Sequence, residues 1–307
     1  MEAGAAIVTA ESLLALTPIA IKSIPLDPLS AVWSRILTSA ALGAFLADSR
    51  QFKMRELTSA ASLGALNLAH IASSYESFRH LPAGQAMSLL YTYPLWNLIL
   101  GAVVRMEAIP SQTYFWMATA TAGSVLLNVD PGRTATPAIS SVKPDRIWGL
   151  GMGLLMALTE SGMFTLTKMI GWTDAAKLVW VLNASAGIWL TLATLLGLVN
   201  FPPFLGFLGF LGDGPQLRPP PKNQKSQWIT MEMAALTAFH AVVLFAGYWL
   251  RFYAIPRLST VTYSILSYSG LLAAYFYGLM FMGERPGWIS AAGAAIIVFS
   301  GLMIEWA

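Results

Sequence analysis

The sequence predicts an all-α integral membrane protein with ten transmembrane helices, arranged as two inverted repeats of five helices each (5+5). Three observations lead to this fold class. The chain of 307 residues is 56% hydrophobic and only 11% charged, against about 25% charged residues in an average soluble domain. Its apolar residues form blocks of about 20, the length that crosses about 30 Å of hydrocarbon. The two halves of the chain also resemble each other in sequence.

Ten apolar blocks lie between short patches of Pro, Gly and charged residues, and each is predicted to form a helix. Helices are expected because a lipid-exposed backbone must satisfy its own hydrogen bonds. The sequence has none of the alternating segments of about ten residues that build a membrane barrel. The predicted helices are 3–22, 29–47, 57–78, 83–104, 111–129, 147–170, 175–199, 229–253, 259–282 and 286–306.

The first block is expected to be a membrane helix and not a cleaved signal peptide. It has no basic lead-in, and it carries Glu11 and Pro18 within its apolar run. A long connection at residues 130–146 divides the chain near its middle. It separates a first five-helix repeat, residues 1–129, from a second, residues 147–307.

A second long connection, residues 200–227, forms a Pro- and Gly-rich insertion within the second repeat. It contains FPPFLGFLGFLG at 201–212, which is apolar but too short and too rich in Gly and Pro to span a bilayer. An interfacial or re-entrant segment is therefore expected here.

Matching residues relate the two halves of the chain. At a separation of 177 the matches are Leu81 with Leu258, Leu89 with Leu266, Tyr91 with Tyr268, Leu95 with Leu272, Gly101 with Gly278 and Glu107 with Glu284. Nearer the start of each half, Glu11 matches Glu160 at a separation of 149. The insertion at 200–227 accounts for the larger separation later in the chain.

The number of helices in each repeat sets the relation between the repeats. Because five is odd, the second copy enters the membrane from the opposite side, so the repeats are expected to be inverted. Such symmetry makes the inward-open and outward-open states nearly equivalent, which favours transport by alternating access.

Charge distribution gives an expected orientation. Ten helices place both termini on one side, and the Lys and Arg residues of the short loops slightly favour cytoplasmic termini. A plasma membrane or bacterial inner membrane is expected in preference to an internal membrane. The net charge of +3 is spread over many loops, so no nucleic-acid partner is expected.

The last helix pair carries a family resemblance. LSTVTYSILSYSGLLAAYFYGLMFMGERPGWISAAGAAIIVFSG, residues 258–301, resembles the end of the ten-helix EamA-like branch of the drug/metabolite transporter superfamily. Glu107, in RMEAIP, departs from the fuller GERP found at Glu284. The resemblance implies the fold and a carrier role for small molecules. It also implies a central cavity lined mainly by helices 1, 3, 4, 6, 8 and 9.

Charged residues inside apolar helices are candidate site residues, because a charge at membrane depth costs about 2.5–3.5 kcal/mol on insertion scales. Glu11 and Glu160 occupy corresponding positions in the two repeats, so symmetry would place them on opposite walls of one central cavity. A substrate or proton role and a structural ion pair both fit. Arg35, on the second helix, is expected to reach Glu11 as an ion-pair partner.

Histidine and further acidic residues extend the set of candidates. His70, Glu76 and His240 are candidate members of a proton relay, because histidine titrates near neutrality. Each also fits a structural role. Glu107 and Glu284 sit at helix exits beside arginines, and a structural role at the ends of the repeats is expected for both.

Hydroxyl groups concentrate in the ninth helix, at RLSTVTYSILSYSGLL, residues 257–272. At about 100° per residue, Ser264 and Ser267 share one side with Tyr263 beside them. Together with Tyr91 of the fourth helix they are candidate hydrogen-bonding residues for a substrate. Ser and Thr hydroxyls can instead bond back to their own helix.

The sequence lacks the motifs of the common catalytic classes. It contains no HExxH, GxSxG or Walker-type phosphate loop and no cysteine, so an enzyme, an ATP-driven pump, a metal site and a resident cofactor are not expected. The expected function is a secondary carrier of a small organic metabolite in a lipid bilayer, with protons as a candidate coupling ion. The alternatives are a nucleotide-sugar or sugar-phosphate antiporter, and a non-transporting scaffold or lipid-handling protein.

Overall fold

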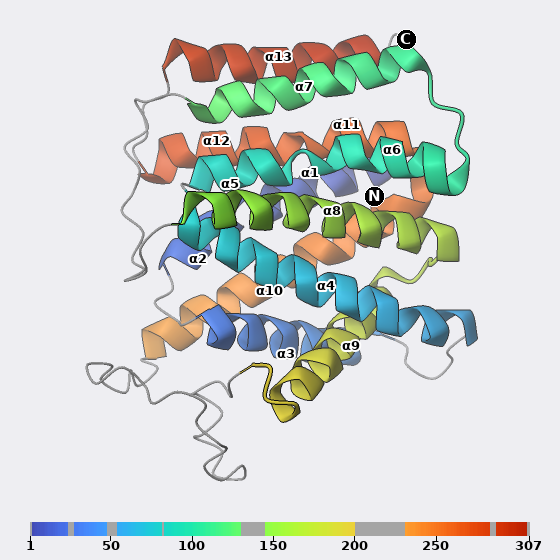
Figure 1. Cartoon of the computed structure of the whole chain (residues 1–307), viewed down its shortest axis with the longest axis vertical. Coiled ribbons are helices and arrows are strands. Elements are labelled where there is room, and N and C mark those ends of the chain that lie inside the picture. The colour runs from blue at the N-terminus through green and yellow to red at the C-terminus, as the bar shows by residue number, and fades with distance from the viewer. Residues whose placement is uncertain are drawn as a thin grey trace.

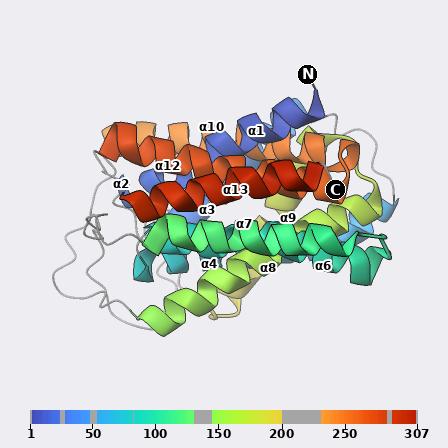
Figure 2. The same ribbon diagram turned by 90° about the horizontal axis from the view of Figure 1, so that it is seen from above.

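The chain forms a bundle of helices that run roughly along one common direction (Figures 1 and 2). The structure is a computed structural model that describes residues 2–23, 28–47, 54–81, 83–129, 145–199, 231–282 and 287–305. Over these residues it contains helices and no strand, which confirms the all-α prediction. The insertion expected at 200–227, most of the connection at 130–146, and Glu284 lie outside the described residues.

The helices follow the predicted segments closely. They are α1 (Ala3–Leu14), α2 (Thr17–Ser23), α3 (Pro28–Leu46), α4 (Met54–His80), α5 (Ala83–Leu90), α6 (Tyr93–Arg105), α7 (Ser111–Val129), α8 (Arg146–Ile170), α9 (Ala175–Leu195), α10 (Met231–Ala254), α11 (Thr260–Ser267), α12 (Ser269–Met282) and α13 (Trp288–Glu305). A short 3-10 turn, Ile255–Arg257, follows α10.

Six stretches among the described residues are long and apolar enough to cross a membrane, as in a multi-pass membrane protein. They are Ala3–Ala20, Leu29–Leu46, Gln85–Arg105, Arg146–Ile170, Ala175–Leu195 and Leu236–Arg257. Trp288–Ile304 is apolar but shorter.

Three of the predicted helices are interrupted, each where the local sequence cannot continue a regular helix. Pro18 follows the turn between α1 and α2, and Pro94 follows the turn at Tyr91 and Thr92 between α5 and α6. Proline has no N–H for the carbonyl four residues earlier and clashes with it. The third break, at Tyr268, precedes Ser269 and Gly270, the kind of Gly/Ser pair at which helices kink.

Helix packing brings distant parts of the chain together. Close pairs are α7 with α13, α4 with α8, α1 with α10, and α3 with α9. In Figure 1 the α7 and α13 pair forms one edge of the bundle, and α3 and α9 lie near the opposite edge. The N-terminal end of α1 and the C-terminal end of α13 lie at the same end of the bundle (Figures 1 and 2).

Glycine permits one of these close approaches. A Cβ atom on Gly123 of α7 would lie 2.9 Å from the carbonyl oxygen of Gly293 on α13. Small residues at such positions let membrane helices approach backbone to backbone.

Candidate functional site

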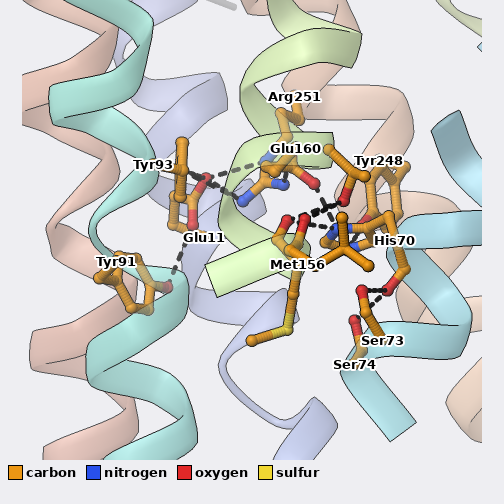
Figure 3. Close-up of polar contacts among 12 residues, drawn as sticks. Glu11, His70, Ser73, Ser74, Tyr91, Tyr93, Met156, Glu160, Tyr248 and Arg251 are labelled. Atoms are coloured by element: carbon orange, nitrogen blue, oxygen red, sulfur yellow. Dashed lines mark hydrogen bonds and ion pairs between the residues drawn. The ribbon is translucent and has the colours of Figure 1, made fainter. Parts of the chain in front are cut away.

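A buried ion-pair cluster lies where α1, α8 and α10 meet (Figure 3). The Arg251 guanidinium on α10 donates from Nε to Glu11 Oε1 at 2.9 Å and from Nη2 to the same oxygen at 2.5 Å. Its Nη1 donates to Glu160 Oε1. Relative exposure is 0% for Glu11 and 4% for both Glu160 and Arg251, so solvent does not screen the three charges.

The cluster places Glu11 and Glu160 on one guanidinium, and Arg251 supplies the positive charge between them. Two carboxylates alone would repel each other in a medium of low dielectric constant. A buried ion of this kind costs several kcal/mol in lost hydration, which only well-placed partners offset. Arg251 offers both carboxylates a hydrogen-bonding N–H, so one cation serves two anions.

Two tyrosines from the break between α5 and α6 complete the contacts of Glu11. Tyr91 Oη donates to Glu11 Oε2 at 3.2 Å, and Tyr93 Oη donates to Glu11 Oε1 at 3.0 Å. In a regular helix, residues two apart point about 200° away from each other. The break at Tyr91 and Thr92 lets both side chains reach one carboxylate.

His70 of α4 faces Glu160 from the other side. Its Nδ1 lies 3.1 Å from the carbonyl oxygen of Met156, which can only accept, so this nitrogen carries a hydrogen. Its Nε2 lies 3.1 Å from Tyr248 Oη and 3.4 Å from Glu160 Oε2. Glu160 Oε2 is buried and accepts no hydrogen bond among the described residues.

A second arginine lies beside the cluster. The Tyr248 ring lies near two guanidinium groups, with Arg35 Cζ 5.5 Å and Arg251 Cζ 5.4 Å from its centroid. Two buried arginines therefore accompany two buried carboxylates, and the charges balance. The predicted pairing of Arg35 with Glu11 is wrong, because Glu11 pairs with Arg251 while Arg35 lies against Tyr248.

The predicted residues of the ninth helix lie next to the cluster but use their hydroxyls differently. Tyr263 packs against Phe164 with ring centroids 4.6 Å apart. Ser264 Oγ accepts from Asn97 Nδ2 at 3.5 Å. Ser267 Oγ bonds back to the carbonyl oxygen of Tyr263 at 2.8 Å, which is the structural alternative for this hydroxyl.

Two other relay candidates lie apart from the cluster. His240 is buried on the same helix as Arg251, but eleven residues earlier, about 16 Å along the axis at 1.5 Å per residue. Its Nε2 has no hydrogen-bond partner among the described residues. Glu76 lies near the end of α4, where it accepts from Arg79 Nη1 at 2.9 Å and from Trp148 Nε1 at 3.0 Å.

Glu107 follows the end of α6 and pairs with Arg105, its Oε2 3.0 Å from Nη2. Met106 between them adopts a left-handed conformation with φ 53°, which lets the Glu107 N–H bond the Gly101 carbonyl at 3.1 Å. The same turn brings the Glu107 carboxylate back to Arg105.

Sequence reasoning missed three members of the cluster, namely Arg251, Tyr93 and Tyr248. Arg251 stands near the end of the predicted helix 229–253, where a basic residue is typical of a helix end next to a loop. Tyr93 offered a signal, since it directly precedes Pro94 and so belongs to a helix break. No sequence signal set Tyr248 apart from the other aromatic residues of its helix.

Comparisons with known proteins support the fold alone. No family model and no curated protein matches this sequence. One solved structure, described only as "Crystal structure of protein", is 15% identical to this chain. It aligns with a TM-score of 0.66 over 99% of this chain and 96% of its own. The helical arrangement is therefore shared by another protein, over nearly the whole length of both chains.

Proposed function

We propose that this chain is a secondary carrier that moves a small organic metabolite across a membrane by alternating access. The observation that carries the proposal is the pairing of Arg251 with both Glu11 and Glu160. The two acids come from corresponding positions of the two halves, and a single cation joins them. Any movement that separates the halves must break one of these two ion pairs, so the cluster is suited to act as the switch between states.

The packing of the helices supports the proposal of ten membrane segments in two inverted repeats. Exchanging the halves converts the contact of α4 with α8 into that of α10 with α1, and both contacts are extensive. The same exchange maps the α7 and α13 pair onto itself, and likewise the α3 and α9 pair. Both chain ends lie at one end of the bundle, as an even number of crossings requires (Figure 1).

Buried acceptors at the cluster also indicate which hydrogen-bonding groups a substrate would carry. Glu160 Oε2 and Asn97 Oδ1 are buried acceptors that have no hydrogen-bond partner among the described residues. Leaving such an atom without a donor costs about 1–3 kcal/mol, more for a charged group. A small metabolite with N–H or O–H groups would satisfy both. The substrate is therefore proposed to be polar and to carry hydrogen-bond donors.

Proton coupling is proposed at His70 and Glu160. A proton bound at His70 Nε2 would lie between this nitrogen and the partnerless Glu160 Oε2, 3.4 Å away. Tyr248 Oη and the charges of Arg35 and Arg251 surround the same position. Protonation of His70 would strengthen the ion pair between Glu160 and His70 on α4. This ion pair would compete with the one between Glu160 and Arg251.

Membership of the EamA-like branch of the drug/metabolite transporter superfamily is part of the proposal. The broken helices at Tyr91 and Tyr268 are 177 residues apart, the separation at which the two halves match in sequence. No enzymatic activity and no ATP hydrolysis are proposed. Cytoplasmic termini in a plasma membrane or bacterial inner membrane remain the expected placement.

The polar interior bears on the scaffold alternative. A scaffold or lipid-handling protein predicts a sealed, apolar centre, whereas Glu11, Glu160 and Arg251 occupy the centre of this bundle. A buried charge cluster contributes less to stability than apolar packing of the same volume. Such a centre is therefore better suited to a molecule that changes conformation than to a static support.

A screen of solutes for stabilisation of the purified chain, followed by exchange of the best candidates in proteoliposomes, tests the function. A ligand that binds only the folded state raises the midpoint of thermal unfolding. The proposal expects saturable counterflow of at least one stabilising solute. Binding without any saturable exchange across the membrane would contradict a carrier.

A further inference from the structure

A second group of charged residues lies at the end of the bundle that holds the chain termini (Figure 1). There α6 ends at Arg105, α8 reaches its last turn at Lys168, and α11 begins at Thr260. Arg105 Nη2 donates to Thr260 Oγ1 at 2.6 Å, and Lys168 Nζ donates to the same oxygen at 3.1 Å. Two cations thus share one neutral hydroxyl as acceptor.

The charges of this group do not balance. Glu107, 3.0 Å from Arg105, supplies one negative charge against the two positive ones. The Arg105 side chain is 9% exposed, and its Nε is buried with no hydrogen-bond partner among the described residues. A buried guanidinium N–H without a hydrogen-bond acceptor costs free energy. A second, negatively charged acceptor beside Arg105 would therefore be favourable.

A helix end and a glycine complete the surroundings of this group, and the helix end favours an anion. The N-terminal end of α11, capped by Ser259, carries the positive end of the helix dipole at the same place. A Cβ on Gly101 would lie 2.9 Å from Glu107 Oε2 and 3.0 Å from Arg105 Nη2, so the absence of a side chain there leaves room for the charged groups.

An aromatic pair separates this group from the central cluster. Arg105 Cζ lies 5.4 Å and Lys168 Nζ 5.6 Å from the Phe164 ring centroid. Phe164 packs on Tyr263, which lies one helical turn beyond Thr260 and is buried beside the central cluster. A ligand bound by Arg105 and Lys168 would therefore be separated from the central cluster by the Phe164 and Tyr263 rings.

We propose that Arg105, Lys168 and Thr260 form a binding site for a compact oxyanion, a carboxylate or phosphate group. Arg105 binds one oxygen through its free Nε–H, and Lys168 binds a second as a point charge. Thr260 Oγ1 accepts from Arg105 Nη2 and from Lys168 Nζ and so fixes the position of both side chains. The site requires binding only, so it stands whether or not the chain transports a solute.

Titration of the purified full chain with sodium phosphate, and separately with sodium acetate, tests this site. Sodium chloride at matched ionic strength serves as the reference, and the thermal unfolding midpoint is the readout. We expect a saturable rise with at least one oxyanion. Arg105→Gln and Lys168→Gln should weaken the apparent affinity at least tenfold. Arg257→Gln, which removes an exposed cation that bonds the Tyr253 carbonyl, should leave the affinity unchanged.

The source of the anion is settled by repeating the titration in nanodiscs. If phosphate binding is lost with phosphatidylglycerol but kept with neutral lipid, the site binds lipid headgroups. If binding is equal in both, the site binds a soluble anion. Direct binding of radiolabelled phosphate to the unmutated chain serves as the second measurement, should Arg105→Gln fail to fold. Absence of saturable binding of either oxyanion, or binding unchanged in Lys168→Gln, overturns the proposal.

Discussion

Tyr91 and Tyr268 stack against each other with ring centroids 6.4 Å apart, and each stands at a break in its helix. They are separated by 177 residues, the interval that relates the two halves in sequence. Their hydroxyls differ in partner, because Tyr91 donates to Glu11 while Tyr268 bonds Thr121 Oγ1 at 2.9 Å. The two tyrosines that the sequence match pairs therefore lie side by side but bond different partners.

Gly270 gives Tyr91 the space to reach Glu11. A Cβ at Gly270 would overlap the Tyr91 hydroxyl and lie 2.9 Å from Glu11 Oε2. Gly270→Ala should therefore destabilise the protein by about 1–3 kcal/mol, as overpacking does, measured by thermal unfolding in detergent. Gly151→Ala is the control, because its Cβ would meet nothing within 4 Å. Equal effects of the two substitutions would contradict the assigned contact.

Arg251 is the cation on which the central cluster depends. Arg251→Gln leaves two buried carboxylates without a counterion and should cost about 3–5 kcal/mol of stability. Arg257→Gln, at an exposed position six residues later, should cost less than about 0.5 kcal/mol. Chemical denaturation of both variants provides the comparison.

The effect of Arg251→Gln should also depend on its partners. Adding Glu11→Gln and Glu160→Gln to Arg251→Gln removes the uncompensated charges, so the triple variant should be more stable than the single one. Additive losses across the three substitutions would show that the ion pairs are not coupled.

His70 and Glu160 are the proposed proton site. With a stabilising solute in hand, His70→Gln and Glu160→Gln should abolish the stimulation of uptake by a pH gradient while solute exchange persists. Exchange should be weaker in Glu160→Gln, because Glu160 Oε2 is also a proposed substrate contact. His240→Gln is the matched control, since His240 is equally buried but distant from the acids. Uptake that ignores an imposed pH gradient in the unmutated protein would rule out proton coupling.

Ser264 and Ser267 are expected to have different roles, Ser264 in contact with the substrate and Ser267 in a hydrogen bond within its own helix. Ser267 bonds back to the Tyr263 carbonyl, whereas Ser264 accepts from Asn97. Ser264→Ala should weaken substrate affinity by about 0.5–1.5 kcal/mol, the net value of one hydrogen bond, and Ser267→Ala should not. Equilibrium binding of the identified solute measures both. A larger loss for Ser267→Ala would reverse the assignment.

The sequence allowed the helices and the two central acids to be predicted, because these depend on local properties. Apolar block length located the helices, and the match of Glu11 with Glu160 marked the two acids. The breaks in the predicted helices 3–22 and 83–104 were not predicted, although Pro18 and Pro94 lie inside these apolar blocks.

Arg251 could not be identified from the sequence, because its role depends on the crossing of α10 with α1 and α8. An arginine near the end of an apolar block has the same local pattern whether it faces a loop or turns inward to meet two acids. The pairing expected for Arg35 was wrong for the same reason. Helix proximity along the chain suggested Glu11, but Tyr248 stands beside Arg35 in the folded bundle.

Alternating access at the central site can be measured without a known substrate, because the chain has no cysteine. A single cysteine at Ser264, buried beside the cluster, is labelled with a membrane-impermeant thiol reagent applied to either face of proteoliposomes. Cysteines at Gln112 and Arg146, exposed in the first turns of α7 and α8, are controls expected to react from one face each, and from opposite faces. The account predicts that the Ser264 position reacts from both faces. Reaction from one face only, or from neither, would contradict it.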